Sequence, residues 1–481
     1  MPRGSNTLRT YTAIPVSKKR SINVNMWGTT DRGFVLRGVL KGFKLSGKAP
    51  SRADLPQIRV NDQFAVRIPR SGVFAVAFPT IPTNLHLELR EFSERTQRMG
   101  QYVTIADFDA KEFPDKVGWH EGGPINIFET VPVNGSDFSI IPMEMGGMQV
   151  RNPLNPSKFL GLAMDLLTTI AHEEGRTVSI GGADIRVSEL YPTLLGFVIR
   201  DLLVGNQREL DAFCDNLVPE GITRGSEAVF LNGAMINHIG EDAIARGLAF
   251  LESNNIKLLQ SPGVSSWLAG GHLFVKKKFP DLVDHRPLLV IGVGKYGLFY
   301  GVGRTETDVV DHVKPLPMPA GFKYEFELPA DVTHEERVGH RNLVIDTIAD
   351  IINRNRIGDH IARPVALVIP GRVVSSEKDP TQRMVISGGG SIPLWPYYGP
   401  SLEDDIRTRL KEDCPVILIN DAVAATVRGL DLFTRRDPDF FQLLHIAIGG
   451  GFGASVAEKV LDRPTFSGIP SGKFVEEESE G

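Results

Sequence analysis

The chain has 481 residues, of which 42% are hydrophobic and 23% are charged, and its formal net charge is −5. This length accommodates two or three domains with cores of their own, and the composition is ordinary for a globular protein. The mildly acidic balance argues against a broad basic face, so we expect no nucleic-acid partner.

Cysteine usage and hydropathy bear on the compartment. The two cysteines, Cys214 and Cys414, stand far apart and lack the spacing of a disulfide framework or a metal site. No uninterrupted apolar run reaches the roughly 18–20 residues of a membrane helix. We therefore expect a cytoplasmic protein without a membrane partner and without a bound structural metal.

The first part of the chain divides into a tail and a β-rich region. Residues 1–19 contain Lys, Arg, Ser and Thr but no acid, which is typical of a disordered basic tail or of an organelle transit peptide. Residues 20–130 alternate apolar and polar positions between Gly and Pro turns, which predicts a β-rich domain. Such a domain offers a surface for a protein partner.

Residues 131–285 change to a helical period and predict an α/β lobe. Apolar spacing predicts helices over 157–175 and 188–205, and residues 227–253 read as a strand, a glycine turn and a helix. His172 and His238 fall in this lobe, and isolated histidines of this kind more often have a structural role than bind a ligand.

Residues 286–470 alternate strands and helices, which predicts a second α/β lobe with a mixed sheet, followed by an acidic tail at 471–481. The expected elements, in chain order, are a glycine-rich hairpin at 287–303, an amphipathic helix at 342–358, a buried strand at 363–374, a charged helix at 401–413, a strand leading into a helix at 414–429, and a strand with a glycine turn at 442–456.

Two motifs in this second lobe could carry chemistry. Gly449, Gly450, Gly451 and Gly453 follow an apolar strand, and their backbone N–H groups could cradle phosphate, although a glycine-rich hairpin is more often only a tight turn. Asp421 ends another apolar strand, where it suits a helix N-cap or a general base at the carboxyl edge of a sheet.

The order of these motifs resembles the ROK family of sugar kinases and regulators, within the actin-like, hexokinase-like ATPase superfamily. The resemblance covers about 175 residues. It implies a two-lobed actin-like ATPase fold with mixed sheets, in which ATP and a sugar meet in the cleft. It makes Asp421 the catalytic base, Asn420 a sugar contact, and the glycine turn at 449–453 a phosphate-binding loop.

The chain also departs from the family pattern. Gly292 stands where the family's phosphate hairpin has a metal-organising Asp, so Gly294 and Lys295 are left as the expected phosphate contacts of that hairpin. Ser391 stands where a sugar-binding Asn is common, and the family's zinc motif is absent. These substitutions weigh against metal-dependent phosphoryl transfer.

Two segments resemble parts of the family that normally follow the glycine turn, yet here they precede it. Residues 141–150 resemble a sugar-contacting segment with Glu144 retained, and residues 227–251, with Gly233, resemble the segment that closes over adenosine. We therefore expect either a circular permutation, in which residues 130–280 complete the lobe begun at 440–460, or a chance resemblance.

Two functions remain open at this stage. The first is a kinase that uses ATP and Mg²⁺ to phosphorylate a sugar or polyol, with Asp421 as base and Asn420, Glu144 and Ser391 on the sugar. The second is a non-catalytic regulator, binding module or assembly subunit that has lost the metal chemistry. The resemblance implies a homo-oligomer in either case.

Overall fold

The computed structural model describes residues 12–460. Gaps in the described residues fall at 18–19, 31–32, 42–55, 62–63, 68–72, 79–82, 94–95, 97, 113–118, 121–124, 127–128, 144–148, 174, 205–222, 263–264, 284–285, 295–296, 305, 325–326, 330, 357–362, 377–378, 388–391, 393–401 and 412.

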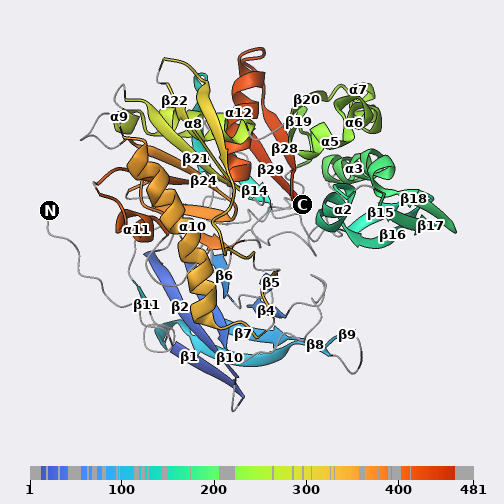
Figure 1. The fold of residues 1–481 in the computed structure, drawn as a ribbon. Helices are drawn as coiled ribbons and strands as arrows, with labels where there is room; N and C mark the ends of the chain where they lie inside the picture. Colours follow the sequence, from blue (N-terminus) through green and yellow to red (C-terminus); the bar gives the residue numbers. More distant parts are fainter. Residues whose placement is uncertain are drawn as a thin grey trace, which may run out of the picture.

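The described residues between 12 and 126 form strands and a short 3-10 helix, Ala110–Glu112. Most of these strands lie in two sheets, which are antiparallel apart from one short parallel pair and whose apolar side chains share one core (Figure 1). The first sheet contains β1 (Thr12–Ser17), β2 (Arg20–Thr30), β3 (Gly33–Lys41) and β6 (Val73–Phe78), with β11 (Trp119–His120) beside β2. The second contains β10 (Val103–Asp109), β7 (Asn84–Arg90), β4 (Gln57–Val60) and β5 (Phe64–Arg67).

A five-stranded mixed sheet lies in the C-terminal half of the chain. Its central hairpin, β21–β22, is antiparallel; β23 adds to β22 in antiparallel orientation, while β24 and then β27 follow β21 in parallel. Where both faces of the sheet are covered, as in β24 and β27, every residue of the strand is buried, and only Asn420 at the end of β27 is polar. Their bounds are β21 (Leu288–Gly294), β22 (Gly297–Gly303), β23 (Val310–Leu316), β24 (Val365–Ile369) and β27 (Val416–Asn420).

A six-stranded mixed sheet combines segments far apart in the chain. Its central hairpin, β28–β29, is antiparallel; β14 adds to β29 in antiparallel orientation, while β19 and then β20 follow β28 in parallel. The sixth strand, β13, pairs with β14. The bounds are β13 (Glu129–Val133), β14 (Ser136–Met143), β19 (Ala228–Gly233), β20 (Lys257–Pro262), β28 (Gln442–Ile448) and β29 (Phe452–Lys459).

The two mixed sheets therefore repeat one arrangement, a meander of three antiparallel strands extended by two parallel strands. In the five-stranded sheet the hairpin strands come first along the chain and the two parallel strands follow. In the six-stranded sheet the two parallel strands come first and the hairpin strands come last. Residues 130–280 thus share a sheet with residues 440–460, as the rearrangement hypothesis requires.

Helices cover the outer faces of both sheets. The helices α10 and α11 pack on the five-stranded sheet, and α2, α3 and α5 to α7 pack on the six-stranded sheet. Thr333 and Glu336 form a capping box at the start of α10. The bounds are α2 (Met164–Ala171), α3 (Val187–Val204), α5 (Met235–Ile239), α6 (Glu241–Gly247), α7 (Phe250–Ser253), α10 (His334–Arg354) and α11 (Leu402–Arg407).

One predicted helix is wrong in its first half. Residues 157–163 belong to β16 (Asn155–Ala163), which pairs with β15 (Gln149–Asn152), and the helix begins only at Met164. An apolar run of this length suits a strand as well as a helix, and pairing decided it. Three further pairs of strands are β17 (Thr177–Ile180) with β18 (Ala183–Arg186), β8 (Phe92–Ser93) with β9 (Arg98–Met99), and β25 (Arg372–Ser376) with β26 (Arg383–Ser387), which β12 (Ile125–Asn126) extends.

Two helices, α8 (Ser265–Lys278) and α12 (Asp421–Thr434), lie between the mixed sheets, and their apolar side chains share one core with both. Each follows the last parallel strand of its sheet, and the short α9 (Pro280–Val283) then leads from α8 to β21. The helices meet at Gly270, where a Cβ atom would lie 1.7 Å from the carbonyl oxygen of Ala424. Only glycine permits this approach.

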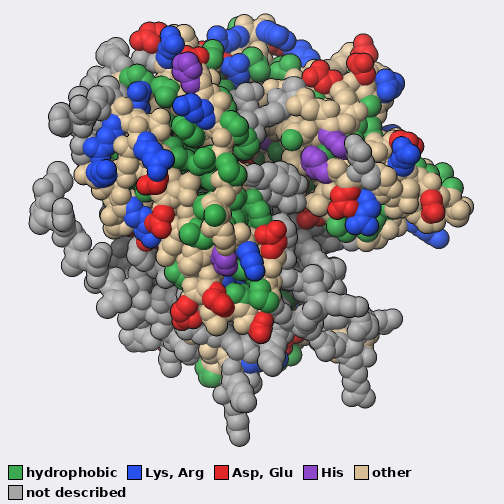
Figure 2. Space-filling view, viewed as in Figure 1, with side chains coloured by type: hydrophobic (Ala, Val, Ile, Leu, Met, Phe, Trp, Pro, Cys, Tyr) green, Lys and Arg blue, Asp and Glu red, His purple; other side chains and the backbone are tan. Residues whose placement is uncertain are grey.

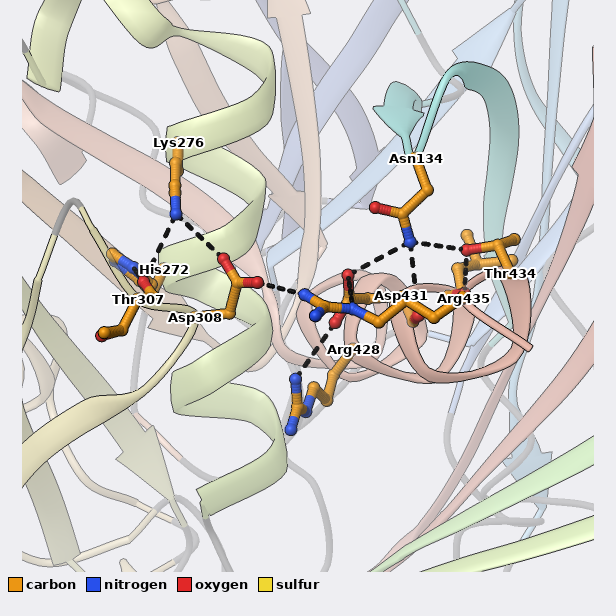
Figure 3. A network of polar contacts seen from close by, with 10 residues as sticks. Asn134, His272, Lys276, Thr307, Asp308, Arg428, Asp431, Thr434 and Arg435 are labelled. Atoms are coloured by element: carbon orange, nitrogen blue, oxygen red, sulfur yellow. Dashed lines mark hydrogen bonds and ion pairs between the residues drawn. The ribbon is translucent and has the colours of Figure 1, made fainter. Parts of the chain in front are cut away.

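An ion-pair network joins the same two helices near their carboxyl ends (Figure 3). Asp308, in the connection between β22 and β23, accepts from Lys276 of α8 at 2.9 Å and from Arg435 at the end of α12. Arg435 also contacts Asp431 of α12 at 3.0 Å. These contacts hold the pKa of Asp308 below its ordinary value even though burial acts in the opposite direction.

The surface in Figure 2 carries Lys and Arg side chains in several groups, some of them beside Asp or Glu side chains. Lys276 with Asp308 and Arg354 with Asp350 are ion pairs of this kind. Within the described part of the chain, no helix combines the length and the apolar character needed to cross a membrane.

Candidate functional site

The turn between β28 and β29 contains three of the predicted phosphate contacts, Gly449, Gly450 and Gly451. The N–H of Gly449 donates to the carbonyl oxygen of Gly451 at 3.0 Å, which closes the turn. No heavy atom of the described residues lies within 4 Å of the position that a Cβ would take at Gly449 or Gly451. The turn is therefore open on that side.

Two side chains from α2 and its carboxyl end form hydrogen bonds with backbone carbonyl oxygens of the turn. Nε2 of His172, at the end of α2, lies 3.1 Å from the oxygen of Gly449, and the hydroxyl of Thr169 lies 3.4 Å from the oxygen of Gly450. A carbonyl oxygen only accepts, so His172 carries a proton on Nε2. Thr169 shares its hydroxyl proton with the backbone oxygen of Asp165, 3.0 Å away.

This support fixes the direction of the neighbouring amides. In a trans peptide unit the C=O of one residue and the N–H of the next point in opposite directions. Because the oxygens of Gly449 and Gly450 point toward α2, the N–H groups of Gly450 and Gly451 point away from it. Two adjacent amides that point the same way are suited to donate hydrogen bonds to an anion.

Gly233, predicted as a nucleotide contact, lies against the same turn. Its φ of 121° favours glycine, and a Cβ there would lie 2.4 Å from the carbonyl oxygen of Ile448 and 3.1 Å from the nitrogen of Gly449. His238, which follows in α5, contacts His172 in a tilted arrangement, with ring centroids 5.3 Å apart and an interplanar angle of 38°. The two histidines that looked isolated in the sequence therefore form a pair beside the turn.

Gly453 has a different position from the other glycines. It lies in β29 opposite Ala447, with a Cβ position 4.0 Å from the Ala447 side chain, and so belongs to the strand ladder. The structure thus brings together Gly233 and Gly449 to Gly451 at one turn, with Gly453 two residues further along the chain.

The hairpin of the five-stranded sheet contains Gly294, which pairs with Gly297 at the end of β21. Lys295 lies outside the described residues, as do Glu144 and Ser391 from the predicted sugar site. Gly292, where the family has a carboxylate, packs under the indole of Trp267 from α8, whose ring atoms would lie 2.2 to 2.9 Å from a Cβ at that position.

Asn420 and Asp421 stand at the junction of β27 and α12, as predicted. The N-cap is Asn420: its Oδ1 accepts from the N–H of Val423 at 3.0 Å, and its Nδ2 donates to the oxygen of Gly371 at 2.7 Å. The N-cap interpretation of Asp421 is therefore wrong by one residue. Asp421 is the first helical residue, half-buried, and its carboxylate accepts from the N–H of Ala422 at 2.9 Å.

A chain of buried polar side chains connects the glycine turn's sheet with the start of α12. Nε2 of His445 lies 2.8 Å from Oδ1 of Asn232, and Nδ1 lies 2.8 Å from the hydroxyl of Ser455. Ser455 contacts the hydroxyl of Thr426, which lies 2.7 Å from the oxygen of Ala422. All four side chains in this chain, Asn232, His445, Ser455 and Thr426, are buried.

Burial determines the protonation state of His445 in this series of hydrogen bonds. It lowers the pKa of His445 to about 3, so the imidazole is neutral near pH 7. The neutral ring donates from Nε2 to Oδ1 of Asn232 and accepts at Nδ1 from the hydroxyl of Ser455, while the hydroxyl of Thr426 donates to the oxygen of Ala422. Since strands rise about 3.3 Å per residue, Ile448 at the turn lies about 10 Å from His445. At the other end of this series of hydrogen bonds is the carbonyl oxygen of Ala422, the residue that follows Asp421.

Position 292 of the hairpin in the five-stranded sheet does not suit a divalent metal. Gly292 supplies no side-chain oxygen ligand, and the carbon edge of Trp267 lies over it. Among the residues that the structure describes, no group of three His, Cys, Asp or Glu side chains could hold a metal ion.

Comparisons with known proteins give little guidance. No protein-family model matches the chain, and no curated protein matches it. It is similar to three solved structures, all of Ppx/GppA proteins of Aquifex aeolicus, at 8–10% identity and TM-scores of 0.21–0.22. These cover 73–74% of this chain and 87–89% of the other. TM-scores this low carry no argument, and none of the comparisons supports the ROK family specifically.

Proposed function

We propose that this chain is a two-lobed, actin-like protein that binds the phosphate groups of a nucleotide at the turn Gly449–Gly451. The repeated strand arrangement supports the two-lobed fold, because both mixed sheets combine an antiparallel meander with two parallel strands. The helices α8 and α12 occupy equivalent places after the last strand of each sheet and pack on one another between the lobes.

The order of strands supports a circular permutation of this fold. One lobe is continuous from β21 to α12. The other lobe starts with β14, continues through β19, β20 and α8, and receives its central hairpin, β28–β29, only after the continuous lobe. Joining the end of β29 to the start of β14 would restore a conventional order in both lobes.

The observation that carries phosphate binding is the fixed orientation of the turn. Thr169 and His172 hold two successive carbonyl oxygens on one side, so the amides of Gly450 and Gly451 point to the other side. Phosphate oxygens accept hydrogen bonds from amides arranged in this way. Gly233 and His238 lie on the neighbouring strand and helix, which leaves the open side of the turn to the ligand.

Phosphorylation of a sugar or polyol is a second candidate. The half-buried Asp421 at the carboxyl end of a parallel strand favours it, since a carboxylate there could accept a proton from a substrate hydroxyl. The Asp421→Asn variant, with its fold intact, is expected to lose sugar-dependent ATP consumption. Equal turnover in wild type and variant would eliminate Asp421 as the base.

The proposal is tested by calorimetric titration with a non-hydrolysable ATP analogue and, separately, with inorganic phosphate. The informative variant is Gly451→Val, because φ at Gly451 is ordinary and its Cβ position is open, so the fold tolerates the side chain while the turn is obstructed. We expect binding to wild type and loss of binding in Gly451→Val at an unchanged unfolding temperature. The control is Gly339→Ala on α10, which also has open space. Absence of binding to wild type would refute the proposal.

A further inference from the structure

The indole of Trp267 takes the space in which a side chain at position 292 would lie. A Cβ on Gly292 would be 2.2 Å from Cζ3 of Trp267, 2.8 Å from Cη2 and 2.9 Å from Cε3. Contacts below 3 Å require one partner to move, and a ring packed between two secondary-structure elements moves less easily than a flexible chain end. The indole can therefore occupy this position only because residue 292 is glycine.

The same ring extends along the strand toward the hairpin. Gly294, two residues on and so on the same face of β21, has a Cβ position 3.7 Å from Cη2 of Trp267 and 3.7 Å from Cε2 of Phe299. Trp267 and Phe299 meet edge to face, with centroids 5.9 Å apart and an interplanar angle of 77°. Together these two aromatic side chains cover the glycines of the hairpin.

Trp267 comes from the opposite lobe of the proposed fold. It lies in the first turn of α8, which follows β20 of the six-stranded sheet, whereas Gly292 belongs to β21 of the five-stranded sheet. The ring is half-buried, so part of it still faces solvent. The contact therefore connects the two lobes on the side where the hairpin of the five-stranded sheet ends.

We infer that Trp267 closes the hairpin of the five-stranded sheet to a metal-bound phosphate, so that the phosphate ligand binds at Gly449–Gly451 without a divalent cation. This inference rests on the proposed function. Mg²⁺ needs carboxylate or water oxygens at about 2.0–2.1 Å in octahedral geometry. A glycine without a side chain and the carbon edge of an indole offer no such oxygen at this position.

The test compares titrations of the full chain with a non-hydrolysable ATP analogue in excess magnesium and in excess chelator. The expected dissociation constants agree within a factor of about two. Binding that strengthens about tenfold or more with magnesium overturns the inference but leaves the proposed function standing. Binding in neither condition overturns both, so the two failures are distinguishable.

A matched pair of variants tests the role of the indole. In Trp267→Ala with Gly292→Asp, the ring is removed and a carboxylate is placed at the strand position that it covered. We expect magnesium to strengthen binding about tenfold in this double variant and not in Trp267→Ala alone. Magnesium independence of the folded double variant would contradict the assignment of Trp267 as the excluding group. The wild-type titration decides the inference even where a variant fails to fold.

Discussion

The contact between α8 and α12 leads to a sharp prediction about stability. Gly270 and Gly339 both lie inside helices, so replacing either by Ala gains helix propensity of about 1 kcal/mol. Their surroundings differ completely. A Cβ at Gly270 would lie 1.7 Å from the oxygen and 2.4 Å from the carbonyl carbon of Ala424, whereas at Gly339 it would meet nothing within 4 Å.

The magnitude follows from what must move. The obstacle at Gly270 is the backbone of α12, which cannot rotate away as a side chain can, so the two helices must separate within a core shared by both sheets. Overpacking of this kind costs about 1–3 kcal/mol or more. We expect Gly270→Ala to lose about 2 kcal/mol net, and Gly339→Ala to gain about 0.5–1 kcal/mol.

The assay is urea unfolding followed by circular dichroism, with the midpoint and slope compared among wild type, Gly270→Ala and Gly339→Ala. The chain has several cores, so the comparison uses the transition that shifts and does not assume a single two-state step. The expected midpoints fall in the order Gly339→Ala, wild type, Gly270→Ala. If Gly270→Ala unfolds at the same urea concentration as Gly339→Ala or at a higher one, the packing of α8 on α12 described above is wrong.

Three further predictions concern buried and half-buried polar groups. Ser455→Ala leaves Nδ1 of His445 without its donor in the core, which is expected to cost about 1–3 kcal/mol in urea unfolding; no loss would contradict the proton arrangement proposed for this chain. Burial raises the pKa of Glu458 to about 7, so its stability contribution is present below the unfolded pKa near 4.3 and is lost as pH rises through 7. Glu458→Gln should therefore exceed wild type in unfolding temperature at pH 8 and match it at pH 4; equal values at both would refute the shift. The pKa of Asp308 is lowered, so its contribution is present above about pH 3.9 and lost as pH falls through the folded value. Asp308→Asn should be less stable than wild type at pH 7 and equally stable in acid. A difference in stability that does not change with pH would contradict a contribution from the ion pair between Asp308 and Arg435.

Local structure was predictable where one interpretation of the pattern dominated. The helix expected over 188–205 is α3, and the strand, turn and helix expected over 227–253 are β19 and the helices after it. The pattern failed over 157–163, where an apolar run without a clear period paired as β16. Asn420 and Asp421 were recognised as a junction, but which of them caps α12 depended on side-chain rotamers that spacing does not reveal.

The candidate site was only partly predictable because its supports come from elsewhere in the chain. The glycines at 449–451 and Gly233 carried a signal, since glycine runs after apolar strands indicate close backbone approach. His172 carried none: its meaning comes from the oxygen of Gly449, 277 positions away along the chain. Trp267 carried no signal either, because its role comes from the packing of its ring over Gly292.

The circular permutation proposed above would preserve resemblance in individual motifs while weakening resemblance along the whole chain. Phe138 pairs with Lys459 and Ala228 with Leu443, so β14 and β19 each meet a partner more than 200 residues away in the chain. Hydrophobic period, turn residues and caps act locally and are unaffected by such a cut, so they still predict the elements. Pairing between distant strands depends on the assembled sheet. A chain whose order is permuted therefore keeps its local signals while losing the linear sequence of motifs by which a family is recognised.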